Sequence, residues 1–150
     1  MNLFDKVSED IKAAMLAKDK VKLEALRGVK KEFIEAKTAK NNTEGKLSDE
    51  MAISILQKMV KQRRESAGIY SAQGRSDLAE SELAEVLVLE AYLPKQLTPE
   101  ELESRLKEII AEVGASGPSD MGKVMGVATK TLAGIAAGKA ISDTVKKLLS

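Results

Sequence analysis

Residues 93–106, LPKQLTPEELESRL, decide how this 150-residue chain is organised. The second half of the stretch holds the signals that begin a helix, with Thr98 as the N-terminal cap, a proline at the first helical position and Glu101 completing a capping box. The first half stops the preceding helix, because Pro94 disfavours the helical conformation of the residue before it. We therefore predict a domain boundary with residues 94–97 as the linker.

Apolar residues recur every three or four positions on both sides of this boundary, which is the spacing of one face of an α-helix. Before the boundary, the predicted helices cover residues 2–18, 23–36, 49–73 and 76–92. After it, they cover residues 99–113, 119–132 and 141–149, with a loop at 134–138. Because no alternating strand pattern is found, we predict an all-α protein, with an N-terminal four-helix domain containing long helices (1–93) and a C-terminal three-helix bundle (98–150).

Single residues at the helix ends support these limits. Ser48 is predicted to cap the third helix, and Ser119 the sixth. Gly74 and Gly114 follow the third and fifth helices, where the positive φ that glycine adopts readily closes a helix C-terminus. We expect the polar run at 40–46 to be a loop.

The composition excludes several kinds of chemistry. The chain has no His, no Cys and no Trp, so an imidazole base, a thiolate nucleophile and the usual Cys/His zinc site are all excluded. No nucleophile and base pair up in the sequence, so we expect no catalytic residue, no cofactor and no metal. No run approaches the roughly 18 apolar residues of a membrane span, and we expect a cytoplasmic protein without a membrane partner.

The charges are unevenly distributed although the formal net charge is only +1. Residues 1–75 carry 16 Lys and Arg against 11 acids, a net charge of +5. Residues 76–112 carry 3 against 10, a net charge of −7, and residues 113–150 carry 5 against 2, a net charge of +3. This pattern fits either ordinary solvated helix faces or two surfaces that bind anions.

A basic patch lies on the predicted third helix, where Lys58, Lys61, Arg63 and Arg64 fall within two turns. One interpretation is contact with phosphate or with an acidic partner. The other is pairing with the acidic fourth helix, packed antiparallel after the turn at Gly74, and we favour this second interpretation.

A glycine-containing helix follows in the C-terminal part, with the sequence MGKVMG at 121–126. Gly122 and Gly126 lie one turn apart on the same face, and each costs about 1 kcal/mol of helix stability relative to alanine. Such a cost is consistent with close helix packing or with close approach to a phosphate backbone. In the second case Lys123 and Lys130, together with Lys139 in the last loop, would supply the cations.

Three stretches of the sequence together resemble the GatB/YqeY family: EAYLPKQL at 90–97, GASGP at 114–118 and DMGKVMG at 120–126. The N-terminal half, with KQRR at 61–64 and GRSDLA at 74–79, resembles the stand-alone YqeY proteins. The resemblance covers nearly the whole chain.

The C-terminal third is similar to the tail domain of the B subunit of tRNA-dependent amidotransferase, a domain that contacts tRNA away from the catalytic centre. This resemblance implies a tRNA-binding type of module and the family label of carbon–nitrogen ligase with glutamine as amido-N-donor. No Gly-Gly-Ser-Ser amidase motif occurs in the sequence. The tail's functional positions match Gly122, Lys123, Gly126, Gly134, Gly138 and Lys139.

Two functional hypotheses follow from these observations. The first is a non-catalytic helical protein that binds tRNA or another structured RNA, or assists the aminoacyl-tRNA amidation machinery. The alternative is an adaptor that binds proteins and no RNA, in which the glycine face receives a partner helix and the third-helix patch binds an acidic surface.

Overall fold

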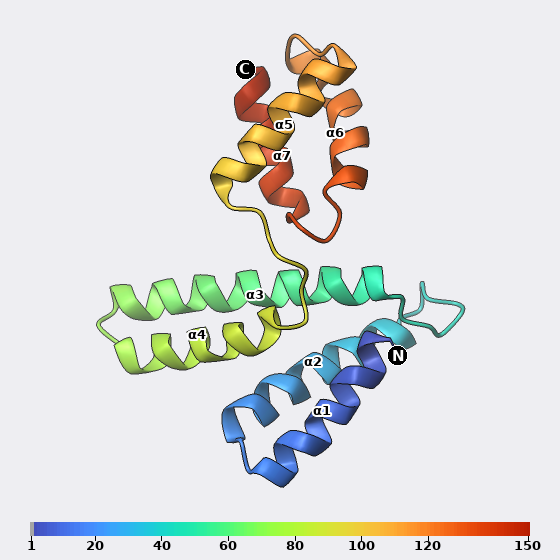
Figure 1. Ribbon diagram of the computed structural model, residues 1–150. Helices are drawn as coiled ribbons and strands as arrows, with labels where there is room; N and C mark the ends of the chain where they lie inside the picture. The colour runs from blue at the N-terminus through green and yellow to red at the C-terminus, as the bar shows by residue number, and fades with distance from the viewer. Residues whose placement is uncertain (1) are drawn as a thin grey trace. The chain divides into compact units, whose positions relative to one another are not determined.

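The computed structural model describes residues 2–150, and every regular element in that part of the chain is helical (Figure 1). The predicted all-α class is confirmed. Contacts between residues divide the chain into two compact units, 1–93 and 94–150, each with its own hydrophobic core. The α-helices are α1 (Leu3–Ala17), α2 (Lys20–Thr38), α3 (Asp49–Ala72), α4 (Ser76–Glu90), α5 (Pro99–Val113), α6 (Met121–Thr131) and α7 (Gly138–Leu149).

The first unit consists of two antiparallel helical hairpins, α1–α2 and α3–α4 (Figure 1). The first hairpin turns at Lys18, whose φ is +57°, and Asp19 then caps α2. The second turns at Gly74, whose φ is +73°, as the sequence predicts for the residue after a helix C-terminus. The fully buried side chains between the hairpins are Val7, Leu26, Val29, Phe33, Leu56 and Leu89.

A hydrogen bond fastens the beginning of the first unit to its end. The Tyr92 hydroxyl donates to the Asp10 carboxylate over 2.5 Å, which joins α1 to the residues that follow α4. Burial, and then the Asp10 carboxylate, raise the pKa of Tyr92 above its ordinary value. The phenol therefore remains a hydrogen-bond donor at a higher pH than an ordinary tyrosine does.

The second unit is a bundle of α5, α6 and α7. The predicted capping box is present, since Thr98 Oγ1 accepts from the Glu101 N–H (3.2 Å) and the Glu101 carboxylate accepts from the Thr98 N–H (3.1 Å). The hydrogen bond from the backbone N–H of Thr98 is the main reason that the pKa of Glu101 lies below its ordinary value. Helix α5 ends at Gly114, with a φ of +69°, and the bundle core contains Leu106, Val124, Leu132, Ile141 and Val145.

The predicted cap at Ser119 is wrong. Residues Pro118–Asp120 form a single 3-10 turn, and α6 begins after it without a side-chain cap. The Asp120 carboxylate instead accepts from the backbone N–H of Ser116, over 2.9 Å. The proline starts this tight turn before a longer helix can form, so the serine lies inside the turn and not before it.

Two residues of the stretch 94–97, with which the second unit begins, are hydrogen-bonded to the loop between α6 and α7. The Leu97 N–H donates to the Ile135 carbonyl over 2.8 Å, and the Gln96 side-chain amide donates to the Gly134 carbonyl over 2.7 Å. Leu97 also packs against the bundle core. These contacts tie the entry of α5 to the loop between α6 and α7.

We predict that a fragment beginning at Gln96 folds alone into a helical bundle, because its core and these two hydrogen bonds are contained within it. Far-ultraviolet circular dichroism with thermal unfolding measures this. A fragment beginning at Thr98 is the control and should melt at a lower temperature, since it lacks Gln96 and Leu97. A Gln96 fragment that stays unfolded where the full chain is helical would show that the bundle depends on the first unit.

Candidate nucleic-acid interface

The two faces of α6 are set by where its apolar residues lie. Val124 and Ala128 are fully buried against α5 and α7, and Leu132 continues this line just after the helix. The opposite side of the helix is exposed, and it includes Gly122, Lys123, Gly126 and Lys130.

The exposed glycines of α6 have open space where a side chain would stand. A Cβ atom built at Gly122 or Gly126 meets no atom within 4 Å apart from its chain neighbours and the helix's own backbone. Packing between helices of this bundle therefore does not explain why these two positions are glycine. The face leaves helix backbone open to an external molecule, at a cost of about 1 kcal/mol of helix stability per glycine.

The lysines beside these glycines are exposed and unpaired. Among the described residues 2–150, no ion pair involves Lys123, Lys130 or Lys139. Lys123 and Lys130 are seven positions apart, which corresponds to about two turns and about 10 Å along the helix. Their ammonium groups can therefore meet two separate negative charges on one ligand.

The remaining predicted site residues lie after the C-terminal end of α6. Gly134 has a φ of +81°, which reverses the chain, and Gly138 begins α7. Lys139 was expected in a loop and is instead in the first turn of α7, because Ala137 is the last extended residue. Ala137 supplies no side-chain cap, so the first N–H groups of α7 and Lys139 together favour negative charge.

The predicted site residues are therefore not all in one place. Gly122 and Lys123 are at the start of α6, whereas Gly134, Gly138 and Lys139 follow its end. The 11 residues of α6 separate the two groups by about 16 Å. Only an extended ligand that follows the helix would meet both groups.

Sequence reasoning missed the role of Gln96 at this end of the bundle. Its amide holds the Gly134 carbonyl and also reaches the Pro94 carbonyl, over 2.8 Å. These bonds position the loop that leads into α7. Gln96 was expected in a linker, and the sequence signal that could have suggested otherwise is its place two residues before the capping box.

The basic patch on α3 is largely neutralised inside the first unit. The Arg63 guanidinium contacts the carboxylates of Glu85 (2.6 Å) and Glu82 (3.5 Å), so the predicted pairing with α4 is present. Burial raises the pKa of the Glu85 carboxyl, and the nearby Arg63 opposes that shift. The buried Arg63 Nε atom has no hydrogen-bond partner.

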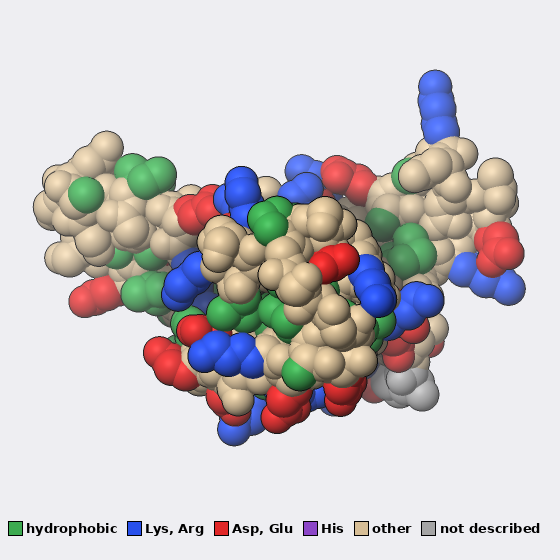
Figure 2. Space-filling model, turned by 90° about the horizontal axis from the view of Figure 1, so that it is seen from above, with side chains coloured by type: hydrophobic (Ala, Val, Ile, Leu, Met, Phe, Trp, Pro, Cys, Tyr) green, Lys and Arg blue, Asp and Glu red, His purple; other side chains and the backbone are tan. Residues whose placement is uncertain are grey.

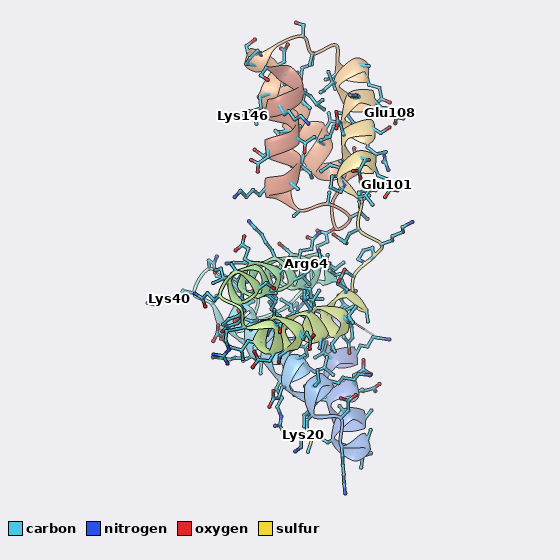
Figure 3. The ribbon with its side chains drawn as sticks, turned by 90° about the vertical axis from the view of Figure 1, so that its left-hand side faces the viewer. Lys20, Lys40, Arg64, Glu101, Glu108 and Lys146 are labelled. Carbon is cyan, nitrogen blue, oxygen red and sulfur yellow. The ribbon has the colours of Figure 1, made fainter. Side chains whose placement is uncertain are left out.

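The other cations of that patch differ in their partners. Arg64 contacts Glu90 of α4 over 2.9 Å, and Figure 3 shows it on α3 beside that helix. Lys61 contacts Glu65 of its own helix over 4.0 Å. Lys58 is exposed and makes no ion pair within residues 2–150. The patch therefore offers one unpaired cation to an external anion, fewer than the α6 face does.

The wider surface carries both signs of charge. On the face shown in Figure 2, Lys and Arg side chains are interspersed with Asp and Glu. On this face, attraction of an anionic ligand must therefore come from local groups and not from one large basic field. Within residues 2–150 there is no cluster of three or more metal-ligating side chains, and no helix there is long and apolar enough to cross a membrane.

Comparison with known proteins shows to which family the chain belongs. The family model described as Yqey-like protein matches residues 4–149. The chain belongs to the YqeY-like family. The predicted resemblance to the stand-alone YqeY proteins is thereby confirmed, whereas the relation to the amidotransferase tail stays a prediction.

Curated relatives of this family member are fungal proteins named "Altered inheritance of mitochondria protein 41, mitochondrial". The Kluyveromyces lactis protein is 32% identical over 117 residues, covering 75% of this chain and 61% of the relative. The Clavispora lusitaniae protein is 32% identical over 118 residues, covering 76% and 66%. The Pyrenophora tritici-repentis protein is 32% identical over 133 residues, covering 86% and 70%. The chain thus spans about 60% of the length of the Kluyveromyces relative.

The relatives correct the expected location. Their names assign them to mitochondria, so the expectation of a cytoplasmic protein is wrong. That expectation rested on the lack of a long apolar run. Such a run distinguishes membrane-spanning proteins from others, but it carries no information about the compartment in which a helical protein resides.

Proposed function

We propose that this YqeY-like protein binds tRNA or another structured RNA along the exposed face of α6. The observation that carries the proposal is the open backbone at Gly122 and Gly126, with Lys123 and Lys130 exposed and unpaired beside it. Two helix-weakening glycines with nothing packed on them have no structural explanation inside the bundle. Close approach of an external backbone gives them one.

An RNA backbone suits this face better than a compact anion does. A double-stranded RNA helix presents a wide, shallow minor groove lined by 2′-hydroxyl groups and phosphates. A helix face without side chains can approach such a surface closely, while lysines on its edge meet the flanking phosphates. The second group, at Gly134, Gly138 and Lys139, would extend the contact along the strand by roughly the length of α6.

We further propose an accessory role in tRNA-dependent amidation, with no catalytic residue and no cofactor contributed by this chain. The support is the resemblance of its C-terminal third to the tRNA-contacting tail of the amidotransferase B subunit. In this role the family label of carbon–nitrogen ligase with glutamine as donor describes the machinery that is assisted. The chain would present tRNA to that machinery.

The alternative is an adaptor that binds a protein and no RNA. The same open glycines would then accept a partner helix, because small residues at a contact shorten the distance between helix axes. The lysines distinguish the two functions, since a helix that packs on glycine does not require two unpaired cations on its edge.

We predict that replacing Lys123 and Lys130 together with glutamine flattens the salt dependence of tRNA binding. Each lost phosphate contact removes about 0.7–0.9 from the slope of log affinity against log salt, so the slope should shrink by roughly 1.4–1.8. Fluorescence anisotropy with labelled tRNA over a salt series measures this slope. Both side chains point away from the core, so the fold should be preserved.

The matched control replaces Lys146 and Lys147, which are exposed on α7 of the same unit (Figure 3 labels Lys146), with glutamine. The control changes the net charge equally and should leave the slope nearly unchanged. Wild-type protein without measurable affinity for tRNA at low salt would contradict the RNA function and favour the adaptor. Equal slopes in the two double variants would place the RNA contact away from α6.

A further inference from the structure

The turn of the α1–α2 hairpin exposes apolar side chains that nothing in the first unit covers. We call residues 12–22 the hairpin tip. Within it Leu16 is 86% exposed, Met15 53% and Val21 48%. Since burying such side chains is favourable, an apolar apex of this kind marks a surface that contacts another molecule.

Lysines surround this apex. Lys12, Lys18, Lys20 and Lys22 lie in the hairpin tip, and Figure 3 shows Lys20 at the end of the hairpin. No ion pair involves these four residues in the described part of the chain, 2–150. Asp19 is the one acid of the tip. As the N-terminal cap of α2, it accepts a hydrogen bond from the backbone N–H of Lys22 over 3.2 Å. The hairpin tip is therefore convex, apolar at its apex and basic around it.

An apolar hollow with acidic residues at its edge lies on α4 of the same unit. Leu87 is 73% exposed and Leu83 46%, and they lie one turn apart on one side of the helix. With Ala84 they line an open hollow of about 420 Å³. Glu80 and the Arg64–Glu90 ion pair lie at its edge. We call this surface the α4 hollow.

We propose that the hairpin tip of one copy docks into the α4 hollow of a second copy. The hollow is wide and shallow, so a protruding apex can rest on it. The chemistry also matches, because leucine and methionine meet leucine while the tip lysines meet Glu80, an exposed acid at the edge of the hollow that makes no ion pair among residues 2–150. The proposal concerns the first unit alone and does not depend on RNA binding by α6.

Geometry makes this contact intermolecular. The α1–α2 hairpin and α4 are fixed to each other through one core, which includes Val7, Phe33 and Leu89. The tip lies at the free end of its hairpin, away from the α3–α4 hairpin (Figure 1). A copy therefore cannot fill its own hollow without opening its core, and tip-to-hollow docking joins copies head to tail.

The contact is small, so the association should be weak and sensitive to salt. A few apolar side chains on each side cover less than the roughly 1,200–2,000 Å² that stable complexes bury. Part of the attraction comes from exposed lysines and acids, which salt screens over about 10 Å at 0.1 M. Assembly is expected to appear only as the protein concentration approaches about 1 mM at low salt.

Sedimentation equilibrium of the full chain tests the proposal. Leu16→Glu and Leu87→Glu should each weaken self-association by roughly tenfold or more, because each places a carboxylate in an apolar contact. Ile34→Glu is the matched control, since Ile34 is 44% exposed on the same hairpin but about 20 Å along α2 from the tip. It should associate as the wild type does. Circular dichroism verifies that all variants are folded.

Mixing the two impaired variants gives the sharpest test. The Leu16→Glu protein keeps an intact hollow and the Leu87→Glu protein keeps an intact tip, so together they should form a one-to-one pair that does not grow further. Wild-type protein that stays monomeric at about 1 mM and low salt would overturn the proposal. So would loss of association in only one of the two variants, or failure of the mixture to pair.

Discussion

Replacing Gly126 with leucine is expected to abolish most RNA binding while making the second unit more stable. The leucine side chain would stand on the open face of α6, where a built Cβ meets nothing within 4 Å apart from its chain neighbours and the backbone of its own helix. It therefore causes no clash inside the protein, and the gain in helix propensity over glycine is about 0.8 kcal/mol. The same side chain keeps an RNA backbone several ångströms away, and we expect the affinity to fall by at least about tenfold.

A glycine on another helix provides the control for this prediction. Gly68 of α3 is also exposed, and a Cβ built there meets nothing within 4 Å. Gly68→Leu should raise stability by a similar amount and leave tRNA affinity unchanged. Thermal unfolding and anisotropy titration with labelled tRNA measure the two quantities on the same samples. Unchanged tRNA affinity in Gly126→Leu would show that RNA, if bound, does not use the glycine face.

The helix limits could be predicted from the sequence because capping is local. Thr98 and Glu101 bond to each other's backbone within four residues, so the pattern alone specifies the geometry. The same holds for Gly74 and Gly114, whose positive φ closes a helix without help from distant residues. Ser119 shows the limit of this reasoning, because a neighbouring proline starts a different turn.

Features that depend on contacts between helices were harder to predict. The sequence left open whether the face at Gly122 and Gly126 receives a helix, because the answer depends on where α5 and α7 pack. For the α3 patch, the sequence indicated an acidic partner helix but not which carboxylates are reached. The partners of Arg63 follow from the register between α3 and α4, which local patterns do not define.

Replacing Phe33 with alanine is expected to have the largest effect on stability, and only in the first unit. Phe33 is completely buried and is the largest of the fully buried side chains. Removing its ring leaves a cavity between the two helical hairpins, and phenylalanine-to-alanine changes in protein cores cost about 3–5 kcal/mol. A loss of this size is a large part of the roughly 5–15 kcal/mol by which a domain is usually stable.

The distribution of aromatic residues lets this effect be assigned to one unit. Tyr70 and Tyr92 both belong to the first unit, so near-ultraviolet circular dichroism reports its packing, whereas far-ultraviolet circular dichroism reports helix in both units. In Phe33→Ala the tyrosine signal should be lost at a lower temperature, with part of the helix signal still melting as in the wild type.

Leu106→Ala is the counterpart, since Leu106 is fully buried in the second unit. Leu106→Ala should leave the tyrosine transition in place and lower the free energy of unfolding of the second unit by about 2–5 kcal/mol. If either change shifted both transitions equally, the two units would be unfolding as one cooperative body.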